Sequence, residues 1–106
     1  MFIINNTCWN LVFCNPRSSN LRTSEGDYVL GMCDNNVKTV YVAVNLTDSK
    51  TEHVICHELT HCVCFEYGIS IPIETEEWLC NFMADYGKEI IYVLEDLLLA
   101  ISQKVA

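Results

Sequence analysis

The stretch His57-Glu58-Leu59-Thr60-His61 has the pattern H-E-x-x-H, and the interpretation of the whole chain depends on it. On a helix, residues four apart share one face, so His57 and His61 would present two imidazoles side by side, next to the Glu58 carboxylate. In metalloproteases such histidines hold Zn²⁺, and the glutamate takes a proton from the water that attacks the scissile carbonyl. We therefore predict that His57 and His61 are metal ligands and that Glu58 is the general base. The alternative is a chance match in a buried helix whose histidines donate to backbone carbonyls.

The sequence around the motif predicts the helix that it requires. Ser49-Lys50-Thr51-Glu52 is a capping-box pattern, which places the start of the helix near Lys50. Gly68 can adopt the left-handed conformation that ends a helix. Apolar residues recur at helical spacing between these two ends: Val54, Ile55, Leu59, Cys62, Val63 and Phe65.

A catalytic zinc site needs a third protein ligand and one open coordination position. His53 lies one turn before His57 on the same helix, so it would stack above the site rather than close it. The longer pattern H-E-x-x-H-x-x-G-x-x-H is excluded, because Cys64 replaces its glycine and Tyr67 replaces its last histidine. A carboxylate is therefore the expected third ligand.

A second predicted helix offers such carboxylates. Thr75 is a plausible N-cap for a helix from Glu76 to Tyr86 that ends at Gly87. Its acidic residues are Glu76, Glu77 and Asp85, and its inward-facing residues are expected to be Trp78, Leu79, Phe82 and Met83. Acidic residues also favour the first turn of any helix through its dipole, so Glu76 and Glu77 have a purely structural explanation as well.

The segment Glu77-Trp78-Leu79-Cys80-Asn81-Phe82-Met83-Ala84 resembles the second motif, E-x-x-A-N-x-F-A, of the small ImmA/IrrE-type zinc peptidases. The stretch 39–58, which leads into the histidine motif, is also similar to that family, so the resemblance covers roughly residues 30–87. Cys80 and Met83 depart from the motif, the interval between the two motifs is short, and we expect no attached regulatory domain. The resemblance implies that Glu77 is the third zinc ligand, as in gluzincins. It also implies a cytoplasmic, bacterial or phage-encoded peptidase with a protein substrate, which in this family suggests a transcriptional repressor.

Two further roles stay open at this stage. Asn81 lies one turn after Glu77, where it either orients a metal ligand or is a solvated helix residue. A peptidase also needs a donor to the oxyanion, and the candidates are His53, Tyr67, Tyr86 and Tyr92.

Composition bounds these predictions. The chain has 106 residues, 51% of them hydrophobic, which predicts one packed domain over residues 1–106. The net charge of −8 argues against a nucleic-acid partner. The seven cysteines are odd in number, and the N-terminus lacks a signal-peptide pattern, so we expect free thiols in a reducing cytosol. A structural zinc site made of cysteines is the less favoured alternative.

The N-terminal half predicts strands. These are expected at Phe2–Asn5, Trp9–Phe13, Tyr28–Met32 and Val37–Val44, with a loop at 15–20 and a turn at 33–36. We expect a small twisted sheet that is mostly antiparallel. Because 40–45 directly precedes the motif helix, it is the candidate strand beside which a substrate would pair. The alternative is an ordinary buried strand, and the alternation of Val40, Val42 and Val44 suits either.

The segment from Glu89 to Lys104 predicts an amphipathic C-terminal helix. Its apolar residues include Ile90, Val93, Leu94, Leu97, Leu98 and Ile101. Glu95 and Asp96 interrupt it, so we expect no membrane span. The helix is expected to cover the core, and Ile91 and Leu99 widen its apolar face enough for a dimer contact.

Together these features predict an α+β, minimal zincin-like fold: a small sheet, a metal helix, a ligand helix and a C-terminal covering helix. The predicted function is a zinc-dependent peptidase, with metal ligands His57, His61 and Glu77 and general base Glu58. It would act on a peptide or protein substrate as a monomer or weak homodimer, without nucleic acid or membrane. The first alternative is a catalytically silent zinc-binding or interaction protein on the same scaffold, and the second is a small inhibitor or regulator of a host or phage partner.

Overall fold

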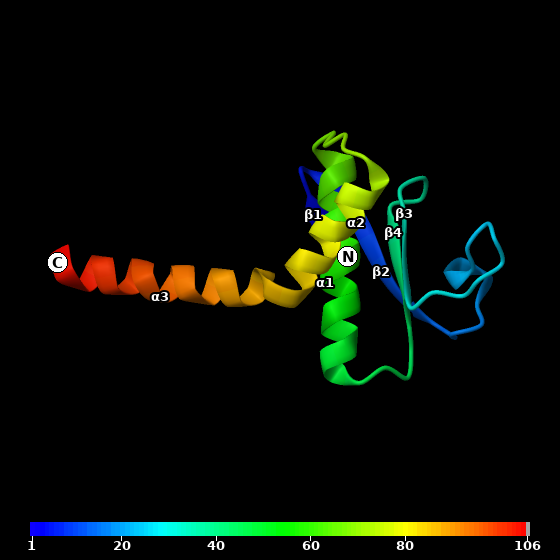
Figure 1. Ribbon diagram of the computed structural model, residues 1–106, viewed down its shortest axis with the longest axis horizontal. Helices are drawn as coiled ribbons and strands as arrows, with labels where there is room; N and C mark the ends of the chain where they lie inside the picture. The colour runs from blue at the N-terminus through cyan, green and yellow to red at the C-terminus, as the bar shows by residue number, and fades with distance from the viewer. Residues whose placement is uncertain (106) are drawn as a thin grey trace.

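A computed structural model describes residues 1–105. The protein is α+β, with a four-stranded sheet and three main helices (Figure 1). The strands are β1 (Phe2–Ile4), β2 (Thr7–Cys14), β3 (Gly31–Asp34) and β4 (Thr39–Ala43). The helices are η1 (Ser19–Leu21, 3₁₀), α1 (Asp48–Glu66), α2 (Ile73–Phe82), η2 (Met83–Gly87, π) and α3 (Lys88–Val105).

The sheet has the strand order β1-β2-β4-β3. It is mixed, because one of its three strand pairs is parallel. The β1–β2 and β3–β4 pairs are antiparallel, as expected, but β2 and β4 are parallel. β4 therefore lies inside the sheet, as in the alternative of a buried strand, and residues 40–45 are not the edge beside which a substrate could pair. The burial of Val40 and Val42 agrees with a central strand. The exposed edge beside the helices belongs to β3, which begins at Gly31 rather than at Tyr28.

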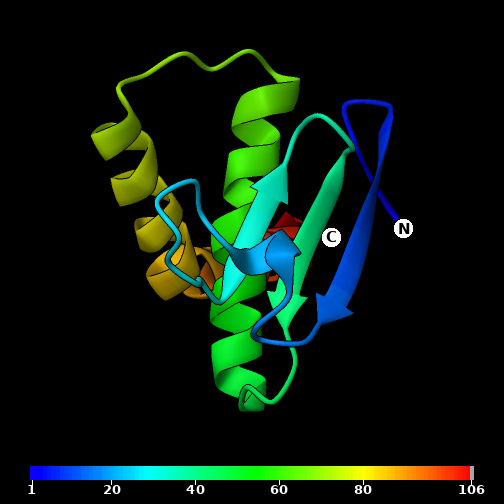
Figure 2. The ribbon, with the colours of Figure 1, turned by 90° about the vertical axis from the view of Figure 1, so that its right-hand side faces the viewer.

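The core lies between one face of this sheet and α1, which runs behind the strands in Figure 2. Trp9 on β2 and Val40 and Val42 on β4 are completely buried. They pack with Val54 and Cys62 of α1. Burial of large apolar side chains of this kind contributes about 1.5–3 kcal/mol each. This packing fixes which side of α1 faces the sheet, and so where the motif residues point.

Helix α1 begins slightly earlier than predicted. Thr47, not Ser49, is the N-cap, and its Oγ1 accepts a hydrogen bond from the Lys50 N–H at 3.2 Å. Asp48 occupies the first turn, where a negative charge is favoured by the helix dipole. The predicted end is confirmed, because Gly68 follows with φ +61° and the Ile69 N–H donates to the Cys64 carbonyl at 2.9 Å.

Helix α2 differs from its prediction at both ends. It begins at Ile73, directly after Pro72, whose fixed φ suits the start of a helix, so Thr75 is not its N-cap. It does not end at Gly87, because the π-helical turn η2 continues its path into α3. The expectation that Trp78 faces inward is also wrong, since this side chain is 63% exposed.

The prediction that the C-terminal helix covers the core is wrong. α3 projects away from the sheet and from α1 as a straight helix (Figure 1). The physical reason is the continuous α2–η2–α3 path, which contains no loop that would let the chain reverse. Large apolar side chains along α3, such as Leu94 and Leu99, are 46% and 58% exposed. Among the described residues no helix has the length and apolar character needed to cross a membrane.

Candidate metal centre

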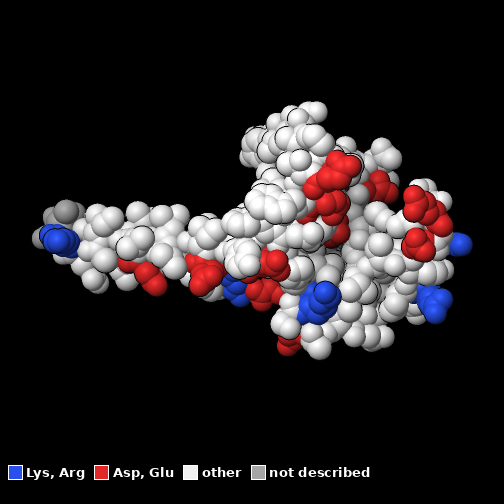
Figure 3. Space-filling view, in the orientation of Figure 1, with Lys and Arg blue, Asp and Glu red and all other residues white. Residues whose placement is uncertain are grey.

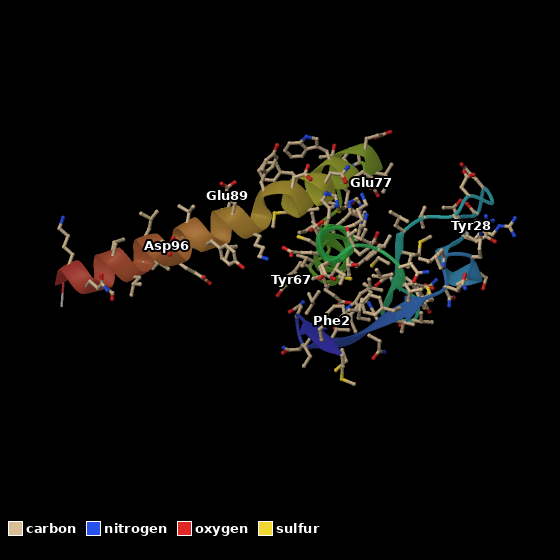
Figure 4. All side chains as sticks on the ribbon, turned by 90° about the horizontal axis from the view of Figure 1, so that it is seen from below. Phe2, Tyr28, Tyr67, Glu77, Glu89 and Asp96 are labelled. Atoms are coloured by element: carbon tan, nitrogen blue, oxygen red, sulfur yellow. The ribbon has the colours of Figure 1, made fainter. Side chains whose placement is uncertain are left out.

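Helices α1 and α2 bring the two motif histidines and Glu77 together. The imidazole centroids of His57 and His61 are 5.1 Å apart, as their spacing of one helical turn requires. Glu77 lies opposite them on α2, and Figure 4 labels it on the side of α2 that adjoins α1. Its Oε2 is 3.2 Å from His57 Nε2, and its Oε1 is 3.0 Å from His61 Nε2. The three predicted ligands thus converge at one point.

The far ring nitrogen of each histidine is held by a second residue of α2. His57 Nδ1 lies 2.9 Å from Asn81 Oδ1, and His61 Nδ1 lies 2.6 Å from Glu76 Oε2. With these oxygens as acceptors, each Nδ1 would carry the proton, and each Nε2 would be left to bind a metal ion held jointly with Glu77. This is the way in which metal-binding histidines are usually oriented.

Cys80 is a further candidate ligand that the sequence interpretation did not single out. Its side chain is completely buried. One ligand atom from each of His57, His61 and Cys80 lies within 4.8 Å of the other two, so these residues could hold a metal ion. Burial raises the pKa of the Cys80 thiol to about 12, and the charge of Glu77 adds to this effect. The donor set offered by the two helices therefore includes imidazole, carboxylate and thiol, a chemistry that suits zinc.

Glu58 lies beside this centre on α1 and is buried, with 7% of its surface exposed. Burial raises its pKa to about 7; His61 lowers this pKa and the nearby charge of Glu77 raises it. A Cβ built on Gly31 would lie 3.2 Å from Glu58 Oε1 and 2.6 Å from Val54 Cγ1. The carboxylate therefore lies directly against the backbone of β3, and a side chain at position 31 would crowd it.

A groove with a cavity volume of about 430 Å³ runs between β3 and the two helices. Its walls include Gly31 and Cys33 of the edge strand and His57, Glu58 and Glu77 of the centre. In Figure 2, β3 is the strand on the side of the sheet nearest α2. The groove therefore gives a ligand access to the metal centre from the edge of the sheet.

The other residues considered from the sequence have different places. Asp85, one of the alternative carboxylate ligands, accepts from His53, with Nε2 and Oδ1 2.8 Å apart. Of the four candidate oxyanion donors, His53 is the one that lines the groove, whereas Tyr67, Tyr86 and Tyr92 are more than half exposed elsewhere. Glu76 contacts the outer nitrogen of His61 and so occupies an orienting position. All seven cysteines are unpaired, although Cys33 Sγ and Cys62 Sγ lie 3.4 Å apart.

Besides Cys80, two features of the site were not found from the sequence. One is the close approach of Gly31 to Glu58, and the other is the role of β3 as the strand that borders the groove. Gly31 lies inside the predicted strand Tyr28–Met32, and this was the available signal, since a strand glycine often marks a close approach of another group. Comparison with known proteins identified no relative: no family model, no curated protein and no solved structure matched the chain.

Proposed function

We propose that the protein is a zinc-dependent peptidase of the ImmA/IrrE type, with His57, His61 and Glu77 as the metal ligands. The observation that carries the proposal is the pair of contacts from the Glu77 carboxylate to both Nε2 atoms, at 3.2 and 3.0 Å. Three protein ligands leave a position for water or substrate, as catalytic zinc sites require. When bound, zinc would polarise the scissile carbonyl and make the attacking water more acidic.

In this proposal Glu58 is the general base and then the general acid. It takes a proton from the water that attacks the carbonyl carbon and delivers that proton to the nitrogen of the leaving amine. Its position one residue after His57 and its place in the groove wall bring it next to the ligands. A purely structural metal site would need no such base, so the presence of Glu58 favours turnover.

The edge strand β3 is the proposed binding site for the substrate backbone. The Leu30 carbonyl accepts a hydrogen bond from the Ala43 N–H at 2.9 Å, so the backbone polar groups of Leu30 point toward β4. Because backbone groups alternate along a strand, those of Gly31 and Cys33 point the other way, to the free edge beside the groove. A substrate segment that pairs there would add a strand to the sheet and pass its scissile bond across Glu58.

The second candidate function is a metal-binding or interaction protein without turnover, and one observation favours it. If Cys80 joined His57, His61 and Glu77, four protein ligands would close the site, which is the arrangement of structural zinc sites. The two functions therefore differ in whether the Cys80 thiol is a ligand and whether the Glu58 carboxylate acts as a base.

The test has two steps. Zinc content per chain is first measured by elemental mass spectrometry for the wild type and for Glu77→Ala, after purification without chelator. We expect close to one zinc per chain in the wild type and a strong loss in the variant. A peptide library is then incubated with the wild type and with Glu58→Gln, and cleavage is followed by mass spectrometry. Zinc-loaded Glu58→Gln should cleave nothing; equal cleavage by both proteins would refute Glu58 as the base.

A further inference from the structure

Helix α3 carries a regular seven-residue pattern along its length. Polar residues occur as neighbouring pairs seven apart, at 88–89, 95–96 and 102–103. The five residues between successive pairs, at 90–94 and 97–101, are apolar or aromatic. Over the 18 residues of α3 the repeat runs for about two and a half heptads, and a seven-residue spacing is the one at which paired helices keep the same face in contact. Figure 3 shows this division, since in this view the acidic atoms follow one side of the projecting helix.

This apolar surface faces solvent. The exposed fractions of nine large side chains of α3 lie between 46% and 58%: Ile90, Ile91, Tyr92, Val93, Leu94, Leu97, Leu98, Leu99 and Ile101. A helix of this composition is normally buried on most sides. Within the described chain, the sheet and α1 do not cover this apolar surface of α3.

An apolar groove adjoins the base of the same helix. It has a volume of about 640 Å³ and lies between α1 and the start of α3, away from the groove of the metal centre. Ile55, Leu59 and Met83 line it, together with the acidic residues Asp48 and Glu52. The groove and the exposed face of α3 are continuous through Ile91, which belongs to both.

We propose that α3 pairs with α3 of a second copy of this chain, antiparallel, around a two-fold axis near the middle of the helix. The central stripe of the repeat consists of Ile90, Leu94, Leu97 and Ile101. In an antiparallel pair, Leu94 of one copy packs against Leu97 of the other, and Ile90 packs against Ile101. Each layer then joins two residues of equal size, and the contact is closed because the same surface serves both copies.

The amount of apolar surface suits this occupant. Seven side chains lie on or beside the central stripe: Ile90, Ile91, Val93, Leu94, Leu97, Leu98 and Ile101. At about 100 Å² of accessible surface each, these side chains set an upper limit of about 700 Å² buried per copy, near the ~800 Å² per partner of a stable interface.

The charges also favour a second copy. In the antiparallel register, Lys104 of one copy lies opposite Gly87 of the other, beside a groove lined by Asp48, Glu52 and Lys88. Lys88 is paired with Glu52 at 2.8 Å, so Asp48 is the remaining negative charge for Lys104 to approach. A membrane surface is a poorer occupant, because the polar side of α3 bears Glu89, Glu95 and Asp96. These charges would be repelled by anionic lipid headgroups.

The test is sedimentation-velocity centrifugation of the full chain over a range of micromolar concentrations. We expect a dimer for the wild type. Leu97→Glu should weaken the dimer by at least about 100-fold, because each dimer contains the substitution twice in its centre. Ser102→Glu adds the same charge on the polar side of α3 and should leave the dimer intact. Leu97 is 56% exposed in the single chain, so the variant's thermal unfolding serves to show that its fold is unchanged.

A charge exchange tests the register. Leu94→Lys alone should also be monomeric, whereas an equal mixture of Leu94→Lys and Leu97→Glu should form a heterodimer, because position 94 of one copy meets position 97 of the other. A mixture that stays monomeric while the wild type dimerises would overturn the antiparallel pairing. A monomeric wild type at 100 µM, or one that binds vesicles of phosphatidylserine and phosphatidylcholine through α3, would overturn the proposal as a whole.

Discussion

His61 is held from its outer side by Glu76, whose Oε2 lies 2.6 Å from His61 Nδ1. Both side chains are nearly buried, with 11% and 13% of their surfaces exposed. The carboxylate thus fixes the orientation of the ring, and Nε2 is directed at Glu77. Two neighbouring glutamates of α2 therefore have different tasks in the proposed site: Glu76 orients a ligand and Glu77 is a ligand.

Replacing Glu76 should consequently weaken metal binding without abolishing it. We expect Glu76→Gln to lower zinc affinity by about 10- to 100-fold, the usual effect of removing an orienting carboxylate. Glu77→Ala should lose far more. Affinity is measured by competition with a chromophoric chelator, and Glu74→Gln, an exposed carboxylate change in the first turn of the same helix, is the matched control. Equal losses in Glu76→Gln and Glu77→Ala would contradict this division of roles.

Asn81 should act on His57 through its side-chain oxygen. Asn81→Asp keeps an oxygen that accepts from His57 Nδ1 and should retain most of the zinc affinity. Asn81→Leu removes the acceptor and should reduce the affinity by about tenfold or more. The same chelator competition measures both variants. If Asn81→Leu binds zinc as tightly as the wild type, the 2.9 Å contact has no part in orienting the ligand.

Cobalt(II) substitution should distinguish an open site from a closed one. With His57, His61 and Glu77 as the ligands, the cobalt protein should show visible ligand-field bands and no thiolate-to-cobalt charge-transfer band in the near ultraviolet. Cys80→Ser should then leave the spectrum unchanged. The control Cys64→Ser, which alters a buried thiol on α1, should do the same. A charge-transfer band that disappears only in Cys80→Ser would assign Cys80 as a ligand and favour the function without turnover.

Gly31 should be sensitive to the smallest side chain. A Cβ at this position would lie 2.6 Å from Val54 Cγ1, so Gly31→Ala should lower the free energy of unfolding by about 1–3 kcal/mol. Because Val54 is β-branched and stiff, it cannot easily move aside. Combining Gly31→Ala with Val54→Ala should recover part of the loss in a double-mutant cycle measured by urea denaturation. Purely additive losses would mean that the two positions do not crowd each other.

The Glu66 carboxylate should make stability depend on pH in acid. Its Oε1 accepts from Lys38 Nζ at 2.7 Å and from the Trp9 indole at 3.0 Å. The hydrogen bond from Lys38 lowers the pKa of Glu66; desolvation opposes this, and hydrogen bonds from Thr7 and Trp9 lower the pKa further. A lowered carboxyl pKa stabilises the fold above the unfolded value of about 4.3, and this stabilisation is lost as the pH falls through the folded pKa. The stability difference between the wild type and Glu66→Gln should therefore be larger at pH 7 than at pH 3 in urea denaturation.

The parts of the site that depend on local helix geometry were predictable. His57 and His61 lie side by side because they are four residues apart on α1, and Asn81 reaches the same centre because it lies four residues after Glu77. Cys80 was not singled out as a ligand, although it lies three residues after Glu77 and residues three apart point to the same side of a helix. Only the contacts between α1 and α2 show that both can approach the histidines.

The pairing of strands and the placement of α3 depend on contacts between distant parts of the chain. The parallel pair joins Asn10 to Thr39, and nothing in either strand's own sequence specifies that partner. The apolar pattern of α3 likewise shows that a surface needs to be covered, but not by what. Whether α3 folds back depends on the chain at Gly87, where a π-helical turn continues the helix that the glycine was expected to end.

That continuous helical path also has a mechanical meaning. The continuous path α2–η2–α3 carries Glu77 near one end and the exposed face of α3 at the other. It resembles a lever whose short arm, α2, bears the candidate metal centre and whose long arm is α3. Its pivot is fastened to α1 at three points: Asp85 contacts His53 at 2.8 Å, the Met83 carbonyl contacts Cys56 at 3.4 Å, and Lys88 contacts Glu52 at 2.8 Å. These contacts tie the junction of the two arms to α1, between the proposed ligand Glu77 and the exposed face of α3.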